Sequence, residues 1–445
     1  MAEGSSYKSE TGGVRMSLAA NKGGKSTDIT AGIIDFRYFE SILNDTISIQ
    51  VTFVDTGGST GGQSVLDGLP IVGGERCFFS ISDVNDVSIE NVPLFVDTVT
   101  PVSDDNRGQI VTLNLKSKEY FINDKIRLKK KFSGKISDSV TDILTNSEYA
   151  LGTDKVLVDI EDTINNFNFL GNMKKPFYTI NWLAKKGVPS DSSALGKSAG
   201  FFFWETSEGY NFKSIDALMD KKKNKPKRSI IYNNTSDELG AQTPKKYTTK
   251  ALEFSSDVPI NAAARQKVGA NATKMVLFDP FNCFYQVVYN NSFENKDGYT
   301  SSGEELLPVQ PEFDTPASRR DFSRTTYYLL DKGTLPDGST EQQLEKSKEE
   351  NFKYAEILNQ SIMRYNQFFG YKVEVTIPGD FELHAGDMIF VDSAEKKDVN
   401  SGDVNQNSGG LYIISELCHF LSTKGTYTRL NLVRDSVGRS GRPNA

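Results

Sequence analysis

The sequence predicts a mainly β protein with an α/β insertion, an α+β chain with two β-barrel modules and one long helix. Two regions, about residues 30–115 and 371–434, alternate apolar and polar residues at the period of two that strands require. Between them, apolar residues recur three and four positions apart, which is the spacing of helices. At 445 residues, the chain is long enough for two or three domains.

The N-terminal segments predict loops rather than a nucleotide site. Residues 1–13 and 19–28 are rich in Gly, Ser, Lys and Asn, a composition typical of loops. The run GGKS at Gly23–Ser26 is like the end of a phosphate-binding loop. However, Ala19 stands where that motif needs its first glycine, and no strand is predicted before it. We therefore reject a nucleotide-binding function for this segment.

The first β module follows these loops. Within Ile33–Asp55, four apolar residues alternate with polar ones and share one face of a strand: Ile47, Ile49, Val51 and Phe53. Further strands are predicted at Arg76–Ser82, Leu94–Val99 and Gln109–Leu115. Short strands at this spacing are typical of a sandwich or barrel of about 100 residues.

After Leu115 the sequence predicts a small α/β part. Helices are expected at Ser117–Asn123, Ile136–Leu144, Phe177–Lys185 and Asn261–Gly269. Strands are expected at Lys274–Phe278 and Cys283–Tyr289, and residues 290–340 are polar and irregular. Two basic runs, Lys125–Lys135 and Lys221–Arg228, belong to this region. The second lacks interleaved aromatic residues and contains a proline, so a solvated connecting loop is favoured over a phosphate-binding patch.

A β-hairpin is predicted at Gly200–Met219, where Phe201–Trp204 and Tyr210–Phe212 flank a turn that contains Gly209. The first arm is apolar at successive positions, so both of its faces must be covered. Its aromatic side chains are therefore expected in a core rather than on a ligand-binding platform. We predict that the arms within 200–215 pair in one sheet with strands from 371–433.

The longest helix is predicted at Glu341–Phe369. Ser339 and Gln342 form a possible capping box, and Gly370 is a natural stop. The helix can pack on its own domain or against a neighbouring subunit, and its periodicity does not separate the two.

The second β module is predicted from four strands, Tyr371–Ile377, Met388–Val391, Leu411–Phe420 and Thr426–Val433, with a polar loop at Ser393–Gly410. Together with the two hairpin arms they make six strands, which can close a small barrel without exposed edges.

Composition excludes several classes of function. The net charge of −7 gives no general case for nucleic-acid binding. Cys77, Cys283 and Cys418 lie far apart without a CxxC pair, so we expect buried free thiols in a reducing cytosol. We expect neither a secretory signal, because the N-terminus lacks an apolar core, nor a membrane-spanning helix.

No catalytic, cofactor-binding or metal-binding residue is assigned. The chain has two histidines, His384 and His419, and both are interpreted as structural. Although Cys418 and His419 could suggest a nucleophile, neighbours in a strand point to opposite faces. Acidic residues concentrate at turns, where they bond to backbone amides. Neither G-x-S-x-G nor H-E-x-x-H occurs.

Four segments carry a resemblance to a known family: GFFFWETSEGYNFKSIDALM (200–219), ANATKMVLFDPFNCFYQVV (270–288), EKSKEENFKYAEILNQSIMRYNQFFGYKVEVTIPGDFELHAGDMIFVD (345–392) and GGLYIISELCHFLSTKGTYTRLNLVRDS (409–436). The chain resembles the baseplate central hub protein of contractile-tailed (myovirus-type, cyanophage-like) bacteriophages. The resemblance covers most of residues 14–436 and is strongest after residue 200. The loop Ser393–Gly410 departs from it, being longer and more polar than expected.

The resemblance implies a domain organisation. It assigns an N-terminal tail-tube-like β-barrel to residues 1–116, a peripheral α/β insertion to 117–198 with 236–340, a second tube-like β-barrel to 199–235 with 370–436, and the long helix to 341–369. Three subunits would form a ring whose six barrels match the sixfold tail tube above and the threefold spike below.

The resemblance also implies a non-enzymatic homotrimeric hub in the tail baseplate of the virion, assembled in the host cytoplasm. Its expected partners are the central spike protein and the tail tube or tube-initiator ring, with tape-measure and baseplate wedge proteins as further candidates. No cofactor, membrane span or sequence-specific nucleic acid is expected. The alternative is a tail-associated cell-wall or polysaccharide hydrolase, which would need paired carboxylates in a cleft. A third hypothesis, an adaptor that grips receptor glycans, would need an exposed aromatic platform.

Overall fold

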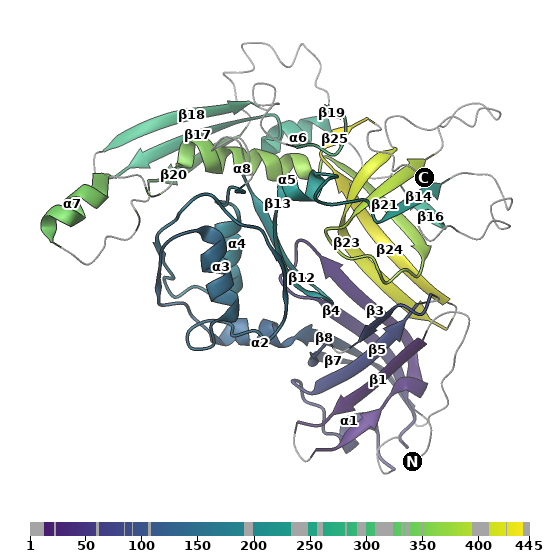
Figure 1. Cartoon of the computed structure of the whole chain (residues 1–445). Coiled ribbons are helices and arrows are strands. Elements are labelled where there is room, and N and C mark those ends of the chain that lie inside the picture. Colours follow the sequence, from purple (N-terminus) through teal and green to yellow (C-terminus); the bar gives the residue numbers. More distant parts are fainter. Residues whose placement is uncertain are drawn as a thin grey trace, which may run out of the picture.

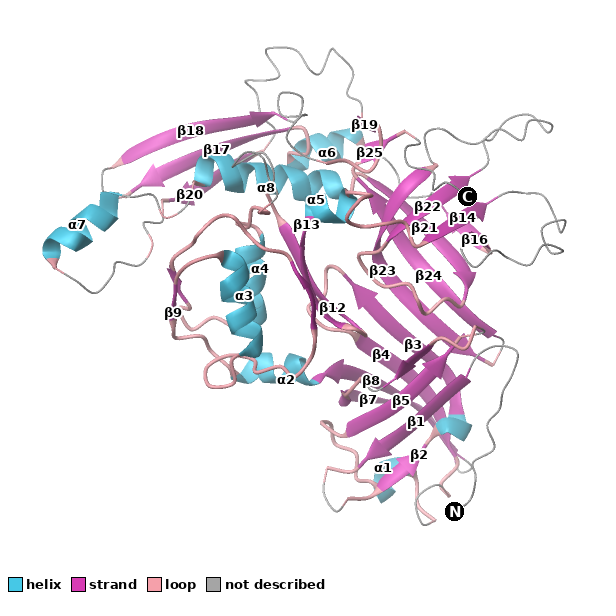
Figure 2. Cartoon of the chain, in the orientation of Figure 1, coloured by secondary structure: helices cyan, strands magenta, loops and turns pink. Residues whose placement is uncertain are grey.

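The structure is a computed structural model that describes residues 13–21, 24–58, 62–83, 85–90, 92–105, 108–190, 199–232, 248–255, 261–280, 283–291, 300–307, 324–330, 333, 339–348, 351, 353–393, 409–423 and 425–438. Within these residues the protein is mainly β, with one large branched sheet and several smaller ones (Figure 2). The predicted loop Ser393–Gly410 lies almost wholly outside the described residues.

The N-terminal β module contains the short helices η1 (Thr30–Gly32) and α1 (Val65–Gly68) and eight strands: β1 (Gly13–Ala19), β2 (Ser26–Asp28), β3 (Ile33–Ser41), β4 (Ser48–Asp55), β5 (Arg76–Ser82), β6 (Ser88–Glu90), β7 (Leu94–Asp105) and β8 (Gly108–Ser117). The strands predicted at Arg76–Ser82, Leu94–Val99 and Gln109–Leu115 are confirmed, and Ile47, Ile49, Val51 and Phe53 share the buried face. The single strand predicted at Ile33–Asp55 is wrong, because this segment turns back on itself as the antiparallel pair β3 and β4. The prediction of a loop at 19–28 is partly wrong, because β1 and β2 pair around it. The expectation that no strand precedes GGKS is also wrong, because β1 does. However, strand β2 begins at Ser26, where a phosphate loop would continue into a helix.

The C-terminal β module consists of β14 (Arg228–Tyr232), β15 (Thr248–Lys250), β16 (Glu253–Ser255), β21 (Tyr371–Pro378), β22 (Met388–Ser393), β23 (Gly410–Ser422) and β24 (Gly425–Arg434). All four strands predicted here from 371–433 are confirmed. The segment 248–255 lies between β14 and β21, because β15 pairs with β14 and β16 pairs with β21. Even so, none of the described sheets closes into a barrel.

The two modules share one sheet and one core. β3 lies beside β23 (Figure 1) and pairs with it in antiparallel register, with Phe39 opposite Cys418. One apolar cluster runs continuously from residues of the N-terminal module, such as Leu113, to Val375 and Leu432 of the C-terminal module. Burial of this much apolar surface in one cluster makes the two modules a single packed unit.

The middle of the chain forms α2 (Lys118–Lys125), β9 (Lys131–Phe132), α3 (Ile136–Thr145), β10 (Leu157–Ile160), β11 (Phe169–Leu170), α4 (Pro176–Ala184), β12 (Phe201–Thr206), β13 (Gly209–Ser214) and α5 (Ile215–Met219). After β14–β16 come α6 (Ala262–Val268), β17 (Ala272–Asp279), β18 (Phe284–Asn291), β19 (Glu305–Leu306), β20 (Thr325–Leu329), α7 (Thr340–Lys348) and α8 (Tyr354–Phe368), and β25 (Ser436–Val437) follows β24. The helices predicted at 117–123, 136–144, 177–185 and 261–269 are confirmed within two residues at each end. Two short strands, β19 and β20, lie in the stretch predicted to be irregular.

The predicted hairpin forms, but its predicted sheet partners are wrong. β12 pairs with β13, and β13 pairs in parallel with β10, which leaves a separate three-stranded sheet. No described residue of 371–433 hydrogen-bonds to it as a strand. In the C-terminal module, β14 and β15–β16 occupy the positions predicted for the two arms. Instead, one face of the hairpin packs against that module through side chains. The apolar residues of a strand do not reveal whether it packs against a sheet in this way or hydrogen-bonds to the edge of that sheet.

The predicted single helix at 341–369 is divided into α7 and α8. The capping box is confirmed, since the Gln342 N–H donates to Ser339 Oγ and the Ser339 N–H donates to Gln342 Oε1. Between the helices, the Asn351 side chain bonds to both the N–H and the carbonyl of Asn168, at 3.0 and 2.8 Å. This long-range contact holds residue 351 in a bend, which periodicity cannot reveal. α8 packs within its own chain, because Ile357 and Phe368 belong to two of its apolar clusters.

Candidate functional site: buried ion pairs at the junction of the modules

The hairpin β12–β13 lies where the two β modules and the α/β part meet. One face, with Phe201, Phe203 and Phe212, joins the α/β core, whereas Phe202 and Trp204 pack against the C-terminal module. The predicted burial of both faces is therefore confirmed, and the aromatic residues are packing rather than a ligand platform.

The tip of the hairpin meets a turn of the C-terminal module at residues 380–387. The Trp204 indole N–H donates to the Ala385 carbonyl at 3.0 Å. Gly386 has φ +92°, and a Cβ built there would lie 2.5 Å from the Trp204 ring. The turn can therefore approach the indole this closely only with glycine at 386.

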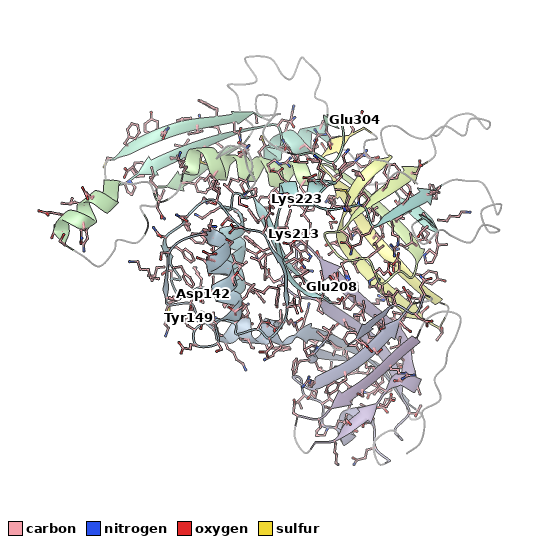
Figure 3. The ribbon with its side chains drawn as sticks, viewed as in Figure 1. Asp142, Tyr149, Glu208, Lys213, Lys223 and Glu304 are labelled. Atoms are coloured by element: carbon pink, nitrogen blue, oxygen red, sulfur yellow. The ribbon has the colours of Figure 1, made fainter. Side chains whose placement is uncertain are left out.

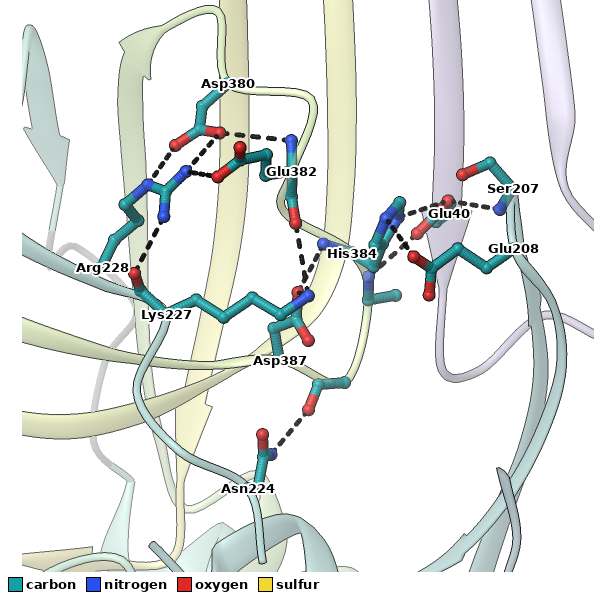
Figure 4. Close-up of polar contacts among 12 residues, drawn as sticks. Glu40, Ser207, Glu208, Asn224, Lys227, Arg228, Asp380, Glu382, His384 and Asp387 are labelled. Carbon is teal, nitrogen blue, oxygen red and sulfur yellow. Dashed lines mark hydrogen bonds and ion pairs between the residues drawn. The ribbon is translucent and has the colours of Figure 1, made fainter. Parts of the chain in front are cut away.

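Glu40 of β3 is a buried carboxylate that holds three segments together. Its Oε1 accepts the Tyr38 hydroxyl at 2.7 Å and the Ser207 N–H of the hairpin turn at 2.9 Å. The same oxygen lies 3.2 Å from His384 Nδ1, and Oε2 accepts the Ala385 N–H at 3.0 Å (Figure 4). One side chain thus ties the N-terminal module to the hairpin and to the 380–387 turn.

His384 is charged because of this pairing. Burial alone would lower its pKa, but the Glu40 carboxylate, with a smaller contribution from Asp387, raises the pKa to about 9. Burial likewise opposes ionisation of Glu40, yet the imidazolium and the hydrogen bonds it accepts hold its pKa below the usual range. Glu208 lies on the hairpin turn (Figure 3), and its Oε1 is 3.9 Å from His384 Nε2 (Figure 4).

A second buried group joins the hairpin to the α/β part and the N-terminal module. Lys155 Nζ contacts Glu119 Oε2 at 2.8 Å and also pairs with Glu205. Glu205 Oε2 in turn accepts the Ser117 hydroxyl at 2.7 Å and the Ile47 N–H at 3.2 Å. Burial raises the pKa of Glu205, an effect that Lys155 only partly offsets.

The end of the basic run Lys221–Arg228 contacts the C-terminal module, so the run is not a wholly solvated loop. Lys221 and Lys222 are exposed as predicted. Arg228 Nε, however, bonds to Asp380 Oδ2 at 2.7 Å, and Lys227 Nζ lies 2.9 Å from Asp387 Oδ2 (Figure 4). The segment that leaves the hairpin is thereby attached to the same 380–387 turn.

A further buried pair fixes α8. The Arg364 guanidinium is 1% exposed and lies 3.1 Å from Asp435 and 3.0 Å from Asp216 of α5. Because Arg364 and Asp435 are almost fully buried, removing the guanidinium would leave a buried carboxylate without its counter-charge.

The second histidine and its neighbouring cysteine do not form a nucleophile pair. His419 is fully buried between Tyr38 and Phe381, and its Nδ1 lies 2.9 Å from Thr428 Oγ1. Burial lowers the pKa of His419 to about 3 and raises that of Cys418 to about 11, so the imidazole and the thiol are both neutral. Cys418 lies on the other, partly exposed face of β23, as predicted.

The expectation of buried free thiols is correct for Cys77, wrong for Cys283 and only partly met by Cys418, which is half-buried. All three cysteines are free, but Cys283 is exposed at the start of β18. Within the described residues, no cluster of His, Cys, Asp or Glu could hold a metal ion. Among the helices that the described residues form, none has the length and apolar character of a membrane-spanning segment.

The sequence contained one signal for this junction. Glu205 follows four apolar residues in a strand whose two faces are both covered, so its charge requires a buried partner. The roles of Glu40 and Lys155 have no local signal, because their charged partners His384, Glu119 and Glu205 are distant in sequence. The buried cations and carboxylates contact one another, and this arrangement serves to fasten segments.

Comparisons with solved structures show the fold. The chain is similar to the 43 kDa tail protein of prophage MuSo2 from Shewanella oneidensis, with a TM-score of 0.51 and 12% identity, over 95% of this chain and 98% of that one. It is also similar to the tail protein from Neisseria meningitidis MC58, with a TM-score of 0.50 and 10% identity, over 96% and 98%. No family model and no curated protein sequence matches the chain.

Proposed function

We propose that this chain is a non-enzymatic structural subunit of a phage tail baseplate, the central hub. Three copies would form a ring that joins the threefold spike to the sixfold tail tube. The observation that carries the proposal is the shared fold, because two tail proteins align with almost the full length of the chain. The sequence resemblance to hub subunits points the same way.

Strand pairing supports two tube-like modules in each copy. Strands β21, β22 and β24 and the segment 248–255 each have a neighbour on both sides, as the strands of a barrel do. The pairing of β23 with β3 connects these strands to the N-terminal module. Three copies with two such modules would give six similar units around the axis, which suits a sixfold tube.

The proposed domains remain 1–116, 117–198 with 236–340, 199–235 with 370–436, and 341–369, with one change. By its hydrogen bonds, the hairpin 201–214 belongs with β10 of the insertion rather than with the second β module. The buried ion pairs around Glu40 and Lys155 support a structural role, because they join the insertion to both β modules.

The test is assembly. We would measure the mass of the purified chain by light scattering and determine its symmetry by cryo-electron microscopy with the spike protein present. The expected result is a threefold ring that also binds the tail tube or its initiator. A stable monomer that never enters a threefold or sixfold ring would contradict the proposal.

A separate assay addresses the non-enzymatic part. The purified chain is applied to peptidoglycan and to host polysaccharide in a zymogram, with a known hydrolase as the positive control. We expect no clearing. Clear lysis would favour the alternative, a tail-associated hydrolase.

A further inference from the structure

A surface that combines cations with apolar side chains lies on the α/β part, around β9, β11 and the start of α4. Its three cations and three large apolar side chains, which we call the basic–apolar patch, are Arg127, Lys129, Lys174, Leu170, Met173 and Tyr178. The cations are exposed, and the apolar side chains are between 53% and 56% exposed. In Figure 2, β9 lies on the outer side of α3, away from the hairpin β12–β13.

The backbone brings both kinds of side chain onto one face. The Met173 N–H donates to the Leu128 carbonyl at 2.9 Å, and the Leu128 N–H donates to the Lys174 carbonyl at 3.0 Å. Because side chains alternate along an extended strand and Leu128 is buried, Arg127 and Lys129 point away from the core. Both cations therefore lie on the outer face, beside the exposed Met173.

The remaining apolar residues continue this face. Leu170 lies opposite the exposed Lys131 in the short β9–β11 ladder. Tyr178 is in the first turn of α4, and Lys174 Nζ lies over its ring, 5.3 Å from the ring centre. A cation thus already occupies one face of the only aromatic ring in the patch.

The patch carries positive charge that the described part of the chain does not neutralise. Residues 125–135 contain six cations and no carboxylate, in a chain whose net charge is −7. Among the described residues, no carboxylate pairs with Lys129 or Lys174, and Arg127 donates to backbone carbonyls. The carboxylates nearby belong to other ion pairs, namely Lys130–Asp142, Lys135–Asp162 and Lys175–Asp124.

We propose that the basic–apolar patch is a docking site for an acidic, amphipathic segment of a partner protein. Carboxylates of the segment would pair with the three cations, and its apolar side chains would cover Leu170 and Met173. A nucleic-acid duplex offers phosphates to the cations but no apolar surface to these two side chains. A single strand needs a free aromatic ring on which its bases stack, whereas the ring of Tyr178 is engaged with Lys174.

The test uses a fluorescein-labelled peptide that repeats Glu-Glu-Leu, titrated with the full chain and followed by fluorescence anisotropy. The comparison probes are a peptide of the same length made only of Glu and a DNA duplex of the same total charge. We expect the Glu-Glu-Leu peptide to bind about tenfold more tightly than the all-Glu peptide, because its leucines cover the exposed apolar side chains. Binding should weaken as the salt concentration rises, because exposed charges are screened.

Variants locate the site. The double variant Lys129→Glu, Lys174→Glu should raise the dissociation constant of the Glu-Glu-Leu peptide about tenfold or more. The matched control Lys221→Glu, Lys222→Glu makes the same change of charge at exposed lysines of the other basic run and should bind as the wild type does. Met173→Asn suits the positive φ of 57° at this position and should remove the preference for the leucine-containing peptide. Circular dichroism confirms that each variant is folded.

Several outcomes would overturn the inference. Wild-type binding that is absent, or that Lys129→Glu, Lys174→Glu leaves unchanged, would show that the patch is not the site, as would an equal loss in the control variant. If the duplex binds more tightly than both peptides and the double variant loses it, the patch binds nucleic acid rather than an acidic protein.

The inference goes beyond the hub proposal and does not depend on it. A wild type that binds the Glu-Glu-Leu peptide at this patch but never enters a ring would contradict the hub proposal alone. A wild type that forms the ring but does not bind the peptide would contradict only the docking site.

Discussion

At the scale of single residues, the junction depends on a few buried charges. Glu40 alone contacts the Tyr38 hydroxyl, His384 and the backbone amides of Ser207 and Ala385. A buried ion pair is weak as a source of net stability, but removing one partner is strongly destabilising because the other charge stays buried. The junction should therefore respond sharply to neutral substitutions that keep the shape of a side chain.

Glu40→Gln tests this expectation. The amide keeps the size of the carboxylate but leaves the His384 imidazolium without its counter-charge, so we expect a loss of about 3 kcal/mol in unfolding free energy. Denaturant unfolding measures it. The control is Glu374→Gln, whose partner Arg429 is 60% exposed, so its loss should stay below about 1 kcal/mol. Equal losses in the two variants would contradict the proposed role of Glu40.

The pH dependence of stability follows from His384. Its pKa rises from 6.5 to about 9 on folding, so its contribution is complete below pH 6.5 and is lost as the pH rises through 9. Between these values the wild type should lose up to about 3 kcal/mol more unfolding free energy than His384→Gln, at about 1.4 kcal/mol per pKa unit. Denaturant unfolding at both pH values measures the difference.

His419→Asn is the matched control for that measurement. Because burial lowers the pKa of His419 to about 3, this imidazole changes charge on folding only on the acid side of pH 6.5. Between pH 6.5 and 9, the unfolding free energy of this variant should therefore fall with pH as steeply as that of the wild type. If it falls less steeply in His419→Asn, or just as steeply in His384→Gln, groups other than His384 cause the loss of stability at alkaline pH.

At the scale of elements, the periodicity of apolar residues predicted the elements that depend on local contacts. It failed for elements whose position or end is determined by a contact with a distant residue. α3 follows from the spacing of Ile136, Val140 and Ile143, all fully buried, because a helix makes its hydrogen bonds within itself. The bend at Asn351 depends on Asn168, and the pairing of β13 with β10 depends on a parallel register set by tertiary packing. The charge of Glu205 hinted at a buried partner, but nothing in the sequence identified Lys155.

Gly386→Ala tests how closely the 380–387 turn approaches the hairpin. The new Cβ would meet the Trp204 ring at 2.5 Å, at a positive φ. The control Gly57→Ala also has a positive φ, +77°, but its Cβ would meet nothing within 4 Å. We expect Gly386→Ala to lose about 2 kcal/mol more than the control in unfolding free energy. Equal losses would show that backbone conformation alone, and not the indole contact, requires glycine at 386.

At the scale of the whole molecule, the two β modules are separate in sequence but continuous in space. A division at residue 116 is natural from the sequence, because strand patterns stop there and helical ones begin. The structure instead places Leu113 and Leu432 in one apolar cluster and joins β3 to β23 by hydrogen bonds. Elements that share a core and a sheet should open together.

Leu113→Ala distinguishes one cooperative unit from two domains. The substitution removes a fully buried side chain from the N-terminal module and should reduce unfolding free energy by about 3 kcal/mol. In native-state hydrogen exchange, we expect the opening free energy of the Leu432 amide in β24 to fall as far as that of Val51 in β4. Leu344→Ala, on an exposed side chain of α7, should change neither. If the fall stays within residues 13–117, the modules unfold independently, and the shared core transmits no stability between them.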